Sequence, residues 1–162
     1  MKRLFRLSAL LFALVFTSVA LQSQQLTVQT DSGKQVVLGR ADLEALPHVK
    51  VTASDHSSGP VNFEGVTLKS VLEKAGITFG ESMKGKRLSN CLLVETADGY
   101  RAVIALPELD PAFTDKQTLL AFLRDGKPLG DKEGPYRIVI PDEKRMARWV
   151  RQVTTLKIVD VQ

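Results

Sequence analysis

The sequence predicts a single α+β domain over residues 21–162, built mainly from short strands. Segments with alternating or β-branched apolar residues recur along the chain, and turn-forming residues bound each of them. The apolar spacing of a helix occurs in only a few short segments, without the regular alternation of strands and helices that marks parallel α/β folds. A chain of this length is long enough to bury one core.

Residues 1–20 have the layout of a secretory signal peptide. A basic head within residues 1–6 precedes the predominantly apolar residues 7–16, and a small-residue site ends at Ala20. The apolar run is short for a bilayer span and no basic cluster follows it, which favours cleavage over a membrane anchor. The head has no twin-arginine pair, so we expect Sec-type export to the periplasm and no membrane span after cleavage.

Charge and residue usage exclude several classes of function. The formal net charge of +4 falls to +1 when the three cations of the leader are removed, which does not favour binding to nucleic acid or to an anionic membrane. The single cysteine, Cys91, can form no internal disulfide, and its apolar setting predicts a buried, inert thiol. His48 and His56 are too few and too isolated for a zinc site.

The first part of the domain is predicted to contain a hairpin, a short helix, a strand and a second helix. The hairpin has alternating apolar residues around a glycine turn. A proline ends the short helix, and the strand runs into turn formers. A short connector precedes the second helix, which is amphipathic and stops at a glycine. The predicted ranges are 26–38 for the hairpin, 40–46 for the short helix, 48–54 for the strand, 61–65 for the connector and 66–77 for the second helix.

The second part is predicted to be mostly strand. Two strands are joined around the tight-turn dipeptide Asp98-Gly99, and a proline-containing loop then leads into an apolar run that turns at Asp125-Gly126. A β-branched run follows, of the kind found in buried strands. The predicted ranges are 86–105 for the strand pair, 118–123 for the apolar run, 136–141 for the buried strand and 153–161 for a last strand.

Between the last two strands, residues 142–152 place a dense group of cations around the only tryptophan. On a helix, an apolar arc of about 100° would hold Met146, Trp149, Val150 and Val153. The opposite side would hold Lys144, Arg148, Arg151 and Gln152, with Arg145 at the border. This pattern predicts an amphipathic helix with a buried tryptophan and a solvated cationic face, and the alternative is that some of the cations face a ligand.

Five segments occur in an order and spacing that resemble the molybdopterin-binding domain of the sulfite oxidase family: FEGVTLKSVLEKAGI, ADGYRAVIAL, LLAFLRDGKPL, GPYRIVIP and RMARWV. The resemblance runs from about Leu26 to the C-terminus. It implies an α+β fold in which a mixed β-sheet curls into a barrel-like core with a few short helices packed against it. It also implies that residues 145–149 line a pocket for the pterin of the molybdenum cofactor.

The sequence departs from the family pattern at the metal. Catalytic relatives carry a cysteine thiolate upstream of the glycine that Gly65 matches, whereas this chain has Ala53 or Ser54 there. Cys91 follows that glycine on a different strand and cannot be carried over. Because a soft metal centre without the thiolate loses its protein anchor, we expect no catalytic and no metal-ligating residue.

A pterin-sized pocket is expected to remain. A pterin needs a stacking partner, which Trp149 would supply, and planar donors, which Arg148 and Arg145 would supply. The predicted acceptors for the amino edge are Asp98, Asp55 or Glu143, with Ser54, His56 and Tyr100 as further polar contacts. Arg137, in the buried strand, is expected to form a structural ion pair instead.

The resemblance to cysteine-less, free-standing members of the family implies a non-catalytic periplasmic protein. Its ligand would be a metal-free pterin, and molybdopterin is disfavoured by the missing thiolate. Ligand occupancy would be passed to a membrane-bound signalling partner. Two alternatives stay open: a molybdenum-cofactor-dependent oxidoreductase domain with unusual ligation, and a ligand-free periplasmic interaction module whose pocket is filled by side chains.

Overall fold

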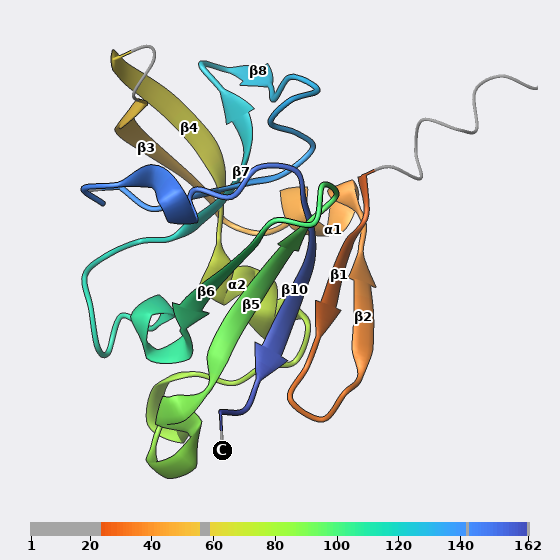
Figure 1. Cartoon of the computed structure of the whole chain (residues 1–162), viewed down its shortest axis with the longest axis vertical. Coiled ribbons are helices and arrows are strands. Elements are labelled where there is room, and N and C mark those ends of the chain that lie inside the picture. The colour runs from red at the N-terminus through yellow and green to blue at the C-terminus, as the bar shows by residue number, and fades with distance from the viewer. Residues whose placement is uncertain (1–23, 56–58, 142, 162) are drawn as a thin grey trace, which may run out of the picture.

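The computed structural model describes residues 24–55, 59–141 and 143–161, and within them ten strands form two five-stranded sheets (Figure 1). The first sheet, sheet A, has the order β2 (Gln35–Leu38), β1 (Leu26–Gln29), β10 (Val153–Val159), β5 (Cys91–Thr96), β6 (Arg101–Ala105). The second, sheet B, has the order β3 (His48–Asp55), β4 (Gly59–Thr67), β7 (Leu119–Arg124), β8 (Lys127–Pro128), and β9 (Arg137–Val139) also pairs with β7.

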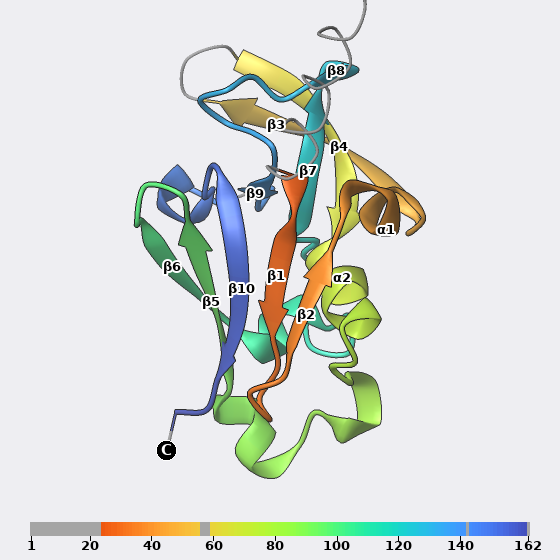
Figure 2. The ribbon, with the colours of Figure 1, turned by 90° about the vertical axis from the view of Figure 1, so that its right-hand side faces the viewer.

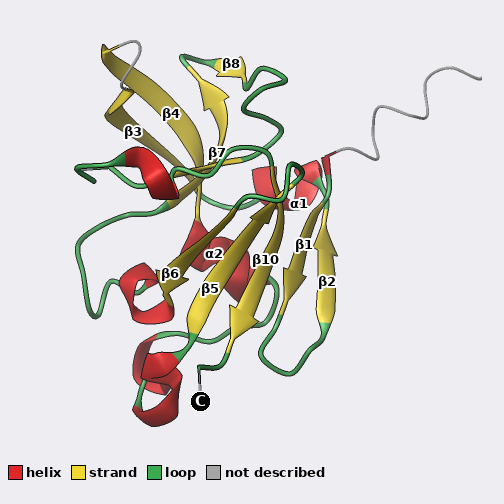
Figure 3. Ribbon diagram, in the orientation of Figure 1, coloured by secondary structure: helices red, strands yellow, loops and turns green. Residues whose placement is uncertain are grey.

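The helices are short (Figure 3). The α-helices are α1 (Arg40–Glu44) and α2 (Leu68–Lys74), and the 3₁₀ turns are η2 (Gly80–Ser82), η3 (Gly85–Ser89), η4 (Leu106–Leu109) and η5 (Met146–Arg148). The two views in Figures 1 and 2 place α2 behind sheet A. The α+β class is therefore confirmed, but the strands of the described residues form two open sheets and not a barrel.

Sheet A is mixed because the first and last strands of the described chain meet in it. β1 and β10 are parallel, with Thr27 opposite Thr155, while the other pairs of this sheet are antiparallel. The predicted hairpin over residues 26–38 and the predicted strand pair around Asp98-Gly99 are both confirmed. Alternate residues of β1 and β5 are buried, as expected for strands with one face on the core.

The second helix forms as predicted but begins later. Thr67 caps it by accepting a hydrogen bond from the Ser70 backbone N–H through its hydroxyl (3.1 Å). Gly76, with φ of +96°, follows its end in the left-handed conformation that favours glycine. The buried face of the helix comprises Leu68, Val71 and Leu72.

The prediction of a connector over residues 61–65 is wrong, since these residues belong to the nine-residue strand β4. Val61 and Phe63 alternate with exposed or half-exposed neighbours, which is the period of a half-buried strand. Gly65 is needed because a Cβ atom there would lie 2.1 Å from the Leu120 carbonyl oxygen of β7. The glycine thus allows β4 to lie between β3 and β7 with a bulge at residues 64–65.

The predicted helix over residues 142–152 is also wrong; the described part of this segment holds only the single turn η5. Three backbone hydrogen bonds hold the following residues against residues 133–138: Ile138 N–H to Val150 O (2.7 Å), Gln152 N–H to Glu133 O (3.0 Å) and Val153 N–H to Tyr136 O (3.0 Å). These bonds replace the bonds of a helix. The predicted burial is nevertheless correct, since Trp149, Val150 and Val153 are buried and Met146 packs against the core.

Several predictions concern residues that the structure does not describe, and one concerns the burial of Cys91. The predicted signal peptide and His56 lie outside the described residues, as does the side chain of Asp55. Cys91 is half-buried on β5 and not fully buried as expected. No helix of the described residues is long and apolar enough to cross a membrane.

Candidate ligand-binding site

Arg148 and Glu143 lie in the wall of a cavity of about 170 Å³. The cavity is bounded by η4, by the loop that precedes β7 and by the segment that follows β9, and its lining residues are Glu108, Thr114, Lys116, Thr118, Ile140, Glu143 and Arg148. Two distant parts of the chain, residues 108–118 and 140–148, therefore converge on one polar space.

Arg148 joins two of these segments through hydrogen bonds. Its Nε donates to Oε1 of Glu143 at 2.8 Å, and its Nη2 donates to the same oxygen. Its Nη1 donates to Oε2 of Glu108 on η4 at 3.3 Å. Burial alone would lower the pKa of Arg148, but the hydrogen bond and charge of Glu143, followed by those of Glu108, outweigh this effect and raise the pKa. The guanidinium is thus a fixed cation in the cavity wall.

The turn η5 sets the direction of Arg148. Met146 packs against the core, and the Trp149 N–H closes the turn by donating to the Met146 carbonyl (3.0 Å). Arg148, between them in the chain, is 34% exposed at its side chain, whereas Trp149 is buried. The turn thus separates a core anchor from a neighbouring cation that lines the cavity.

Trp149 lies in the core, next to a residue of the cavity wall. Its indole N–H donates to the carbonyl of Ile140 at 2.9 Å, and its ring meets Phe63 edge-on with centroids 6.0 Å apart. The guanidinium of Arg137 lies over the same indole, 5.6 Å from the ring centroid. Among the described residues that line this cavity, Ile140 and not Trp149 forms the apolar part of the wall.

The turn between β5 and β6 touches η5. The Tyr100 hydroxyl donates to the Ala147 carbonyl at 2.8 Å, which brings this predicted residue next to Arg148 in the chain. Asp98 instead serves its own turn, because its Oδ1 accepts from the Thr96 hydroxyl and from the Tyr100 N–H (3.1 Å). These two bonds, the Thr96 one first, lower the pKa of Asp98.

The remaining predicted residues are not joined to this cavity in the described part of the chain. Ser54 is exposed near the end of β3, opposite Pro60 on β4. Arg145 is exposed, as are Lys144 and Arg151. The structure therefore brings Glu143 and Arg148 together in the cavity wall, places Tyr100 against the backbone of η5, and leaves Ser54 and Arg145 on the surface.

Sequence reasoning missed the residues that complete the cavity. Glu108, Thr114, Lys116 and Thr118 lie in and after the proline-containing loop, where no periodic pattern marks them. Glu108 meets Arg148 across forty positions of sequence only because η4 and η5 both lie near β6. The one signal in the sequence was Arg148 itself, a cation for which no protein acceptor had been assigned.

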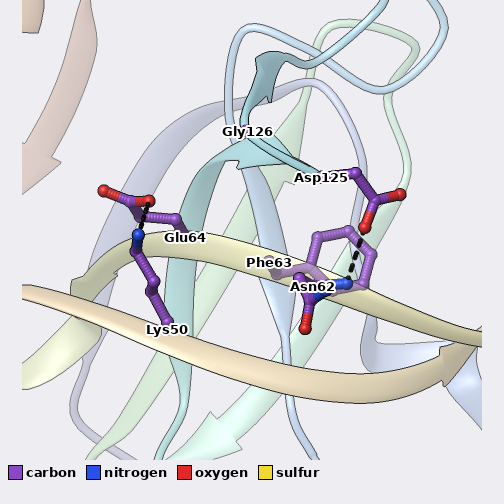
Figure 4. Close-up of a pocket in the computed structure, with 6 residues that line it drawn as sticks. All are labelled: Lys50, Asn62, Phe63, Glu64, Asp125 and Gly126. Carbon is purple, nitrogen blue, oxygen red and sulfur yellow. Dashed lines mark hydrogen bonds and ion pairs between the residues drawn. The ribbon is translucent and has the colours of Figure 1, made fainter.

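A second cavity, of about 340 Å³, lies on sheet B (Figure 4). Its polar groups are engaged with one another: Lys50 pairs with Glu64 at 3.1 Å, and the Asn62 N–H donates to Oδ1 of Asp125 at 3.0 Å. His48 and then Lys50 lower the pKa of Glu64 through their hydrogen bonds. A third concavity, of about 390 Å³, is lined by sheet A residues Glu95, Thr96, Gly99, Arg101, Thr154 and Thr155.

The described side chains include no thiolate near the end of β3 that would hold a molybdenum centre. No group of three or more His, Cys, Asp or Glu side chains that could hold a metal ion is found among the described residues. Cys91, the only cysteine in the chain, lies on β5 opposite Ala105 and Val159, away from the β3 positions Ala53 and Ser54. The polar wall around Arg148 fits the edge of an organic ring better, since it offers both donors and acceptors.

Comparisons with known proteins agree with this fold. The sequence profile of the family described as oxidoreductase molybdopterin binding domain matches residues 15–162. The chain is similar to the crystal structure of the sulfane dehydrogenase SoxCD from Paracoccus pantotrophus, with a TM-score of 0.66 and 20% sequence identity. That similarity covers 86% of this chain and 39% of the SoxCD chain. A search of curated proteins found no match.

Proposed function

This chain belongs to the oxidoreductase molybdopterin-binding domain family, whose sulfite oxidase-like fold it has, and we propose that it is a non-catalytic pterin-binding protein of the periplasm. The observation that carries the proposal is the position of Arg148. This cation lines a polar cavity with Glu143 and Glu108 and does not extend from a helix into solvent. The family resemblance implies that the pterin binds at residues 145–149, the segment that contains Arg148.

The absence of the metal-binding cysteine supports a binding role over catalysis. Catalytic relatives hold the metal through a cysteine at the end of the strand matched by β3, and this chain has Ala53 and Ser54 there. Neither side chain is a soft ligand, and Cys91 lies on another sheet. The pterin would therefore bind without molybdenum.

Thermal unfolding of the exported protein with a panel of oxidised and reduced pterins tests the proposal. A ligand at 100 times its dissociation constant adds about 2.7 kcal/mol of stability, which raises the unfolding temperature by several degrees. Arg148→Ala should weaken binding about tenfold or more, because it removes a charge-assisted donor from the cavity wall. Arg151→Ala, which removes an exposed cation from the same segment, is the matched control.

Two results would contradict the proposal. One is a protein that no pterin stabilises, which would favour the ligand-free interaction module. The other is stoichiometric molybdenum in the purified protein by trace-metal analysis, which would favour the oxidoreductase.

The signalling part of the proposal rests on the resemblance and on the predicted leader. A binding protein without a reaction acts through a partner, and a periplasmic one would reach the cytoplasm through a membrane-bound signalling protein. A pull-down from detergent-solubilised membranes, with and without the pterin, checks this part. Capture that does not depend on the pterin would contradict it.

A further inference from the structure

We infer that Glu143 makes the cavity selective for rings that present adjacent N–H donors, such as the 2-amino-4-oxo edge of a pterin. The inference rests on the proposed function and adds the group that recognises the ligand. It starts from the two oxygens of one carboxylate, whose surroundings differ.

Oε1 of Glu143 is fully engaged and fixes the side chain. It accepts from both Nε and Nη2 of Arg148, so the guanidinium binds this oxygen alone and leaves the other one open. Arg148 thus binds this carboxylate through one oxygen and not through both, as a bidentate pair would.

Oε2 of Glu143 is buried and has no hydrogen-bond partner among the described residues. A buried charged acceptor without a donor is unfavourable, so folded proteins rarely keep one. Glu143 also lines the cavity, and its side chain is only 14% exposed. A ligand N–H that donates to Oε2 would therefore satisfy an acceptor that is buried and unpaired in the protein without ligand.

The other candidate carboxylates differ in this respect. Asp98 accepts two hydrogen bonds within its own turn and is exposed. Glu108, in the same cavity wall, is 50% exposed and can be hydrated. Glu143 alone among these three combines burial with an open oxygen.

The rest of the wall complements a ring of this kind. An oxygen of Glu143 can accept from two N–H groups, which pterins offer side by side at N3 and at the 2-amino group. Arg148 and Lys116 are donors in the same wall and can serve the neighbouring ring carbonyl. The cavity of about 170 Å³ is smaller than the roughly 300–1,000 Å³ that encloses a whole drug-sized ligand. It would therefore hold a ring edge while the rest of the ligand lies outside.

The test compares pterin with lumazine, which has the same bicyclic frame but a carbonyl in place of the 2-amino group. Fluorescence titration of the wild-type protein should show that pterin binds about tenfold or more tightly, because lumazine would place an acceptor against a carboxylate oxygen. Glu143→Gln, which has an amide donor at that position, should reduce this preference to less than about threefold. The matched control, Glu73→Gln on α2, removes a charge outside this cavity and should keep it.

The outcomes distinguish a failure of the proposed pterin-binding function from a failure of the role of Glu143. Wild-type protein that binds neither compound contradicts the proposed function itself. Wild-type protein that binds both equally leaves the function standing and overturns the role of Glu143. An undiminished preference in Glu143→Gln overturns it as well. If Glu143→Gln does not fold, Glu143→Asp, whose carboxylate is one methylene shorter, should also reduce the preference, and an unchanged preference there would overturn the role of Glu143.

Discussion

Two arginine–glutamate pairs lie near each other in the chain and have opposite surroundings. Arg137 pairs with Glu133 at 2.6 Å, and their side chains are 1% and 15% exposed. Arg148 pairs with Glu143, and their side chains are 34% and 14% exposed. In both pairs the glutamate is largely covered, so the difference lies in what surrounds the arginine.

Side chains fill the space around Arg137. Its guanidinium lies 5.2 Å from the centroid of Phe63 and 5.6 Å from that of Trp149, and Glu133 also accepts from Arg124 at 2.9 Å. Arg148 instead borders a cavity and leaves one oxygen of its partner open. The same pair of residue types thus supports the core in one place and forms a candidate binding wall in the other, and packing decides which.

Arg137→Met is the strongest test of this contrast. The substitution should cost about 2–3 kcal/mol of the free energy of unfolding, because Glu133 loses its bond to Arg137 in a covered site while it keeps the one to Arg124. Chemical denaturation measures this cost. The double variant Arg137→Met/Glu133→Gln should recover part of the loss. A cost below about 1 kcal/mol would mean that the pair is as weak as a surface pair.

Arg148→Ala should cost much less in the same measurement. Its side chain is one-third exposed, so its removal opens Glu143 to water, and the loss should be about 1 kcal/mol. The variant should therefore unfold at nearly the wild-type denaturant concentration while it loses pterin affinity. A stability loss close to that of Arg137→Met would make Arg148 a structural residue and erase the contrast between the two pairs.

The smallest change in stability is expected for Asp98→Asn, because Asp98 is an exposed carboxylate whose hydrogen bonds lie within its own turn. Its pKa is lowered by the Thr96 hydroxyl and the Tyr100 N–H, so its stabilisation is present above the ordinary aspartate pKa of about 3.9 and is lost as the pH falls through the lowered value. The unfolding temperatures of wild type and Asp98→Asn should differ slightly at pH 6 and converge well below pH 4. A difference that does not change with pH would contradict this account.

Local pattern was sufficient to predict much of the fold. The hairpin β1–β2, the strand pair β5–β6 and the helix α2 each carry their own periodicity and their own turn or cap. The ion pair of Arg137 was also predicted, because an arginine in a β-branched buried run needs an acceptor. These features depend on neighbours in the sequence or on one simple rule about buried charge.

The failures share a cause, which is hydrogen bonding to distant strands. Residues 149–153 have helical spacing, yet Val150 and Val153 bond to the backbone of residues 136–138. A 3₁₀ turn followed by an irregular segment, with Gln152 in the left-handed region (φ +52°), buries the same positions as a helix would, so the burial was right and the element was wrong. The same holds for the site. Glu143 and Arg148 are close in the sequence and were predicted, whereas Glu108 lies forty positions away and contacts Arg148 only because of the fold.

The parallel pairing of β1 with β10 also constrains when the protein can fold. Both strands are interior to sheet A, so the sheet has no centre until residues 153–159 are available. Sheet A therefore cannot be completed before residues 153–159 are available, and its central pairing has high contact order. Slow closure of this kind leaves β1 and β5 exposed to aggregation or to chaperones until the last strand arrives.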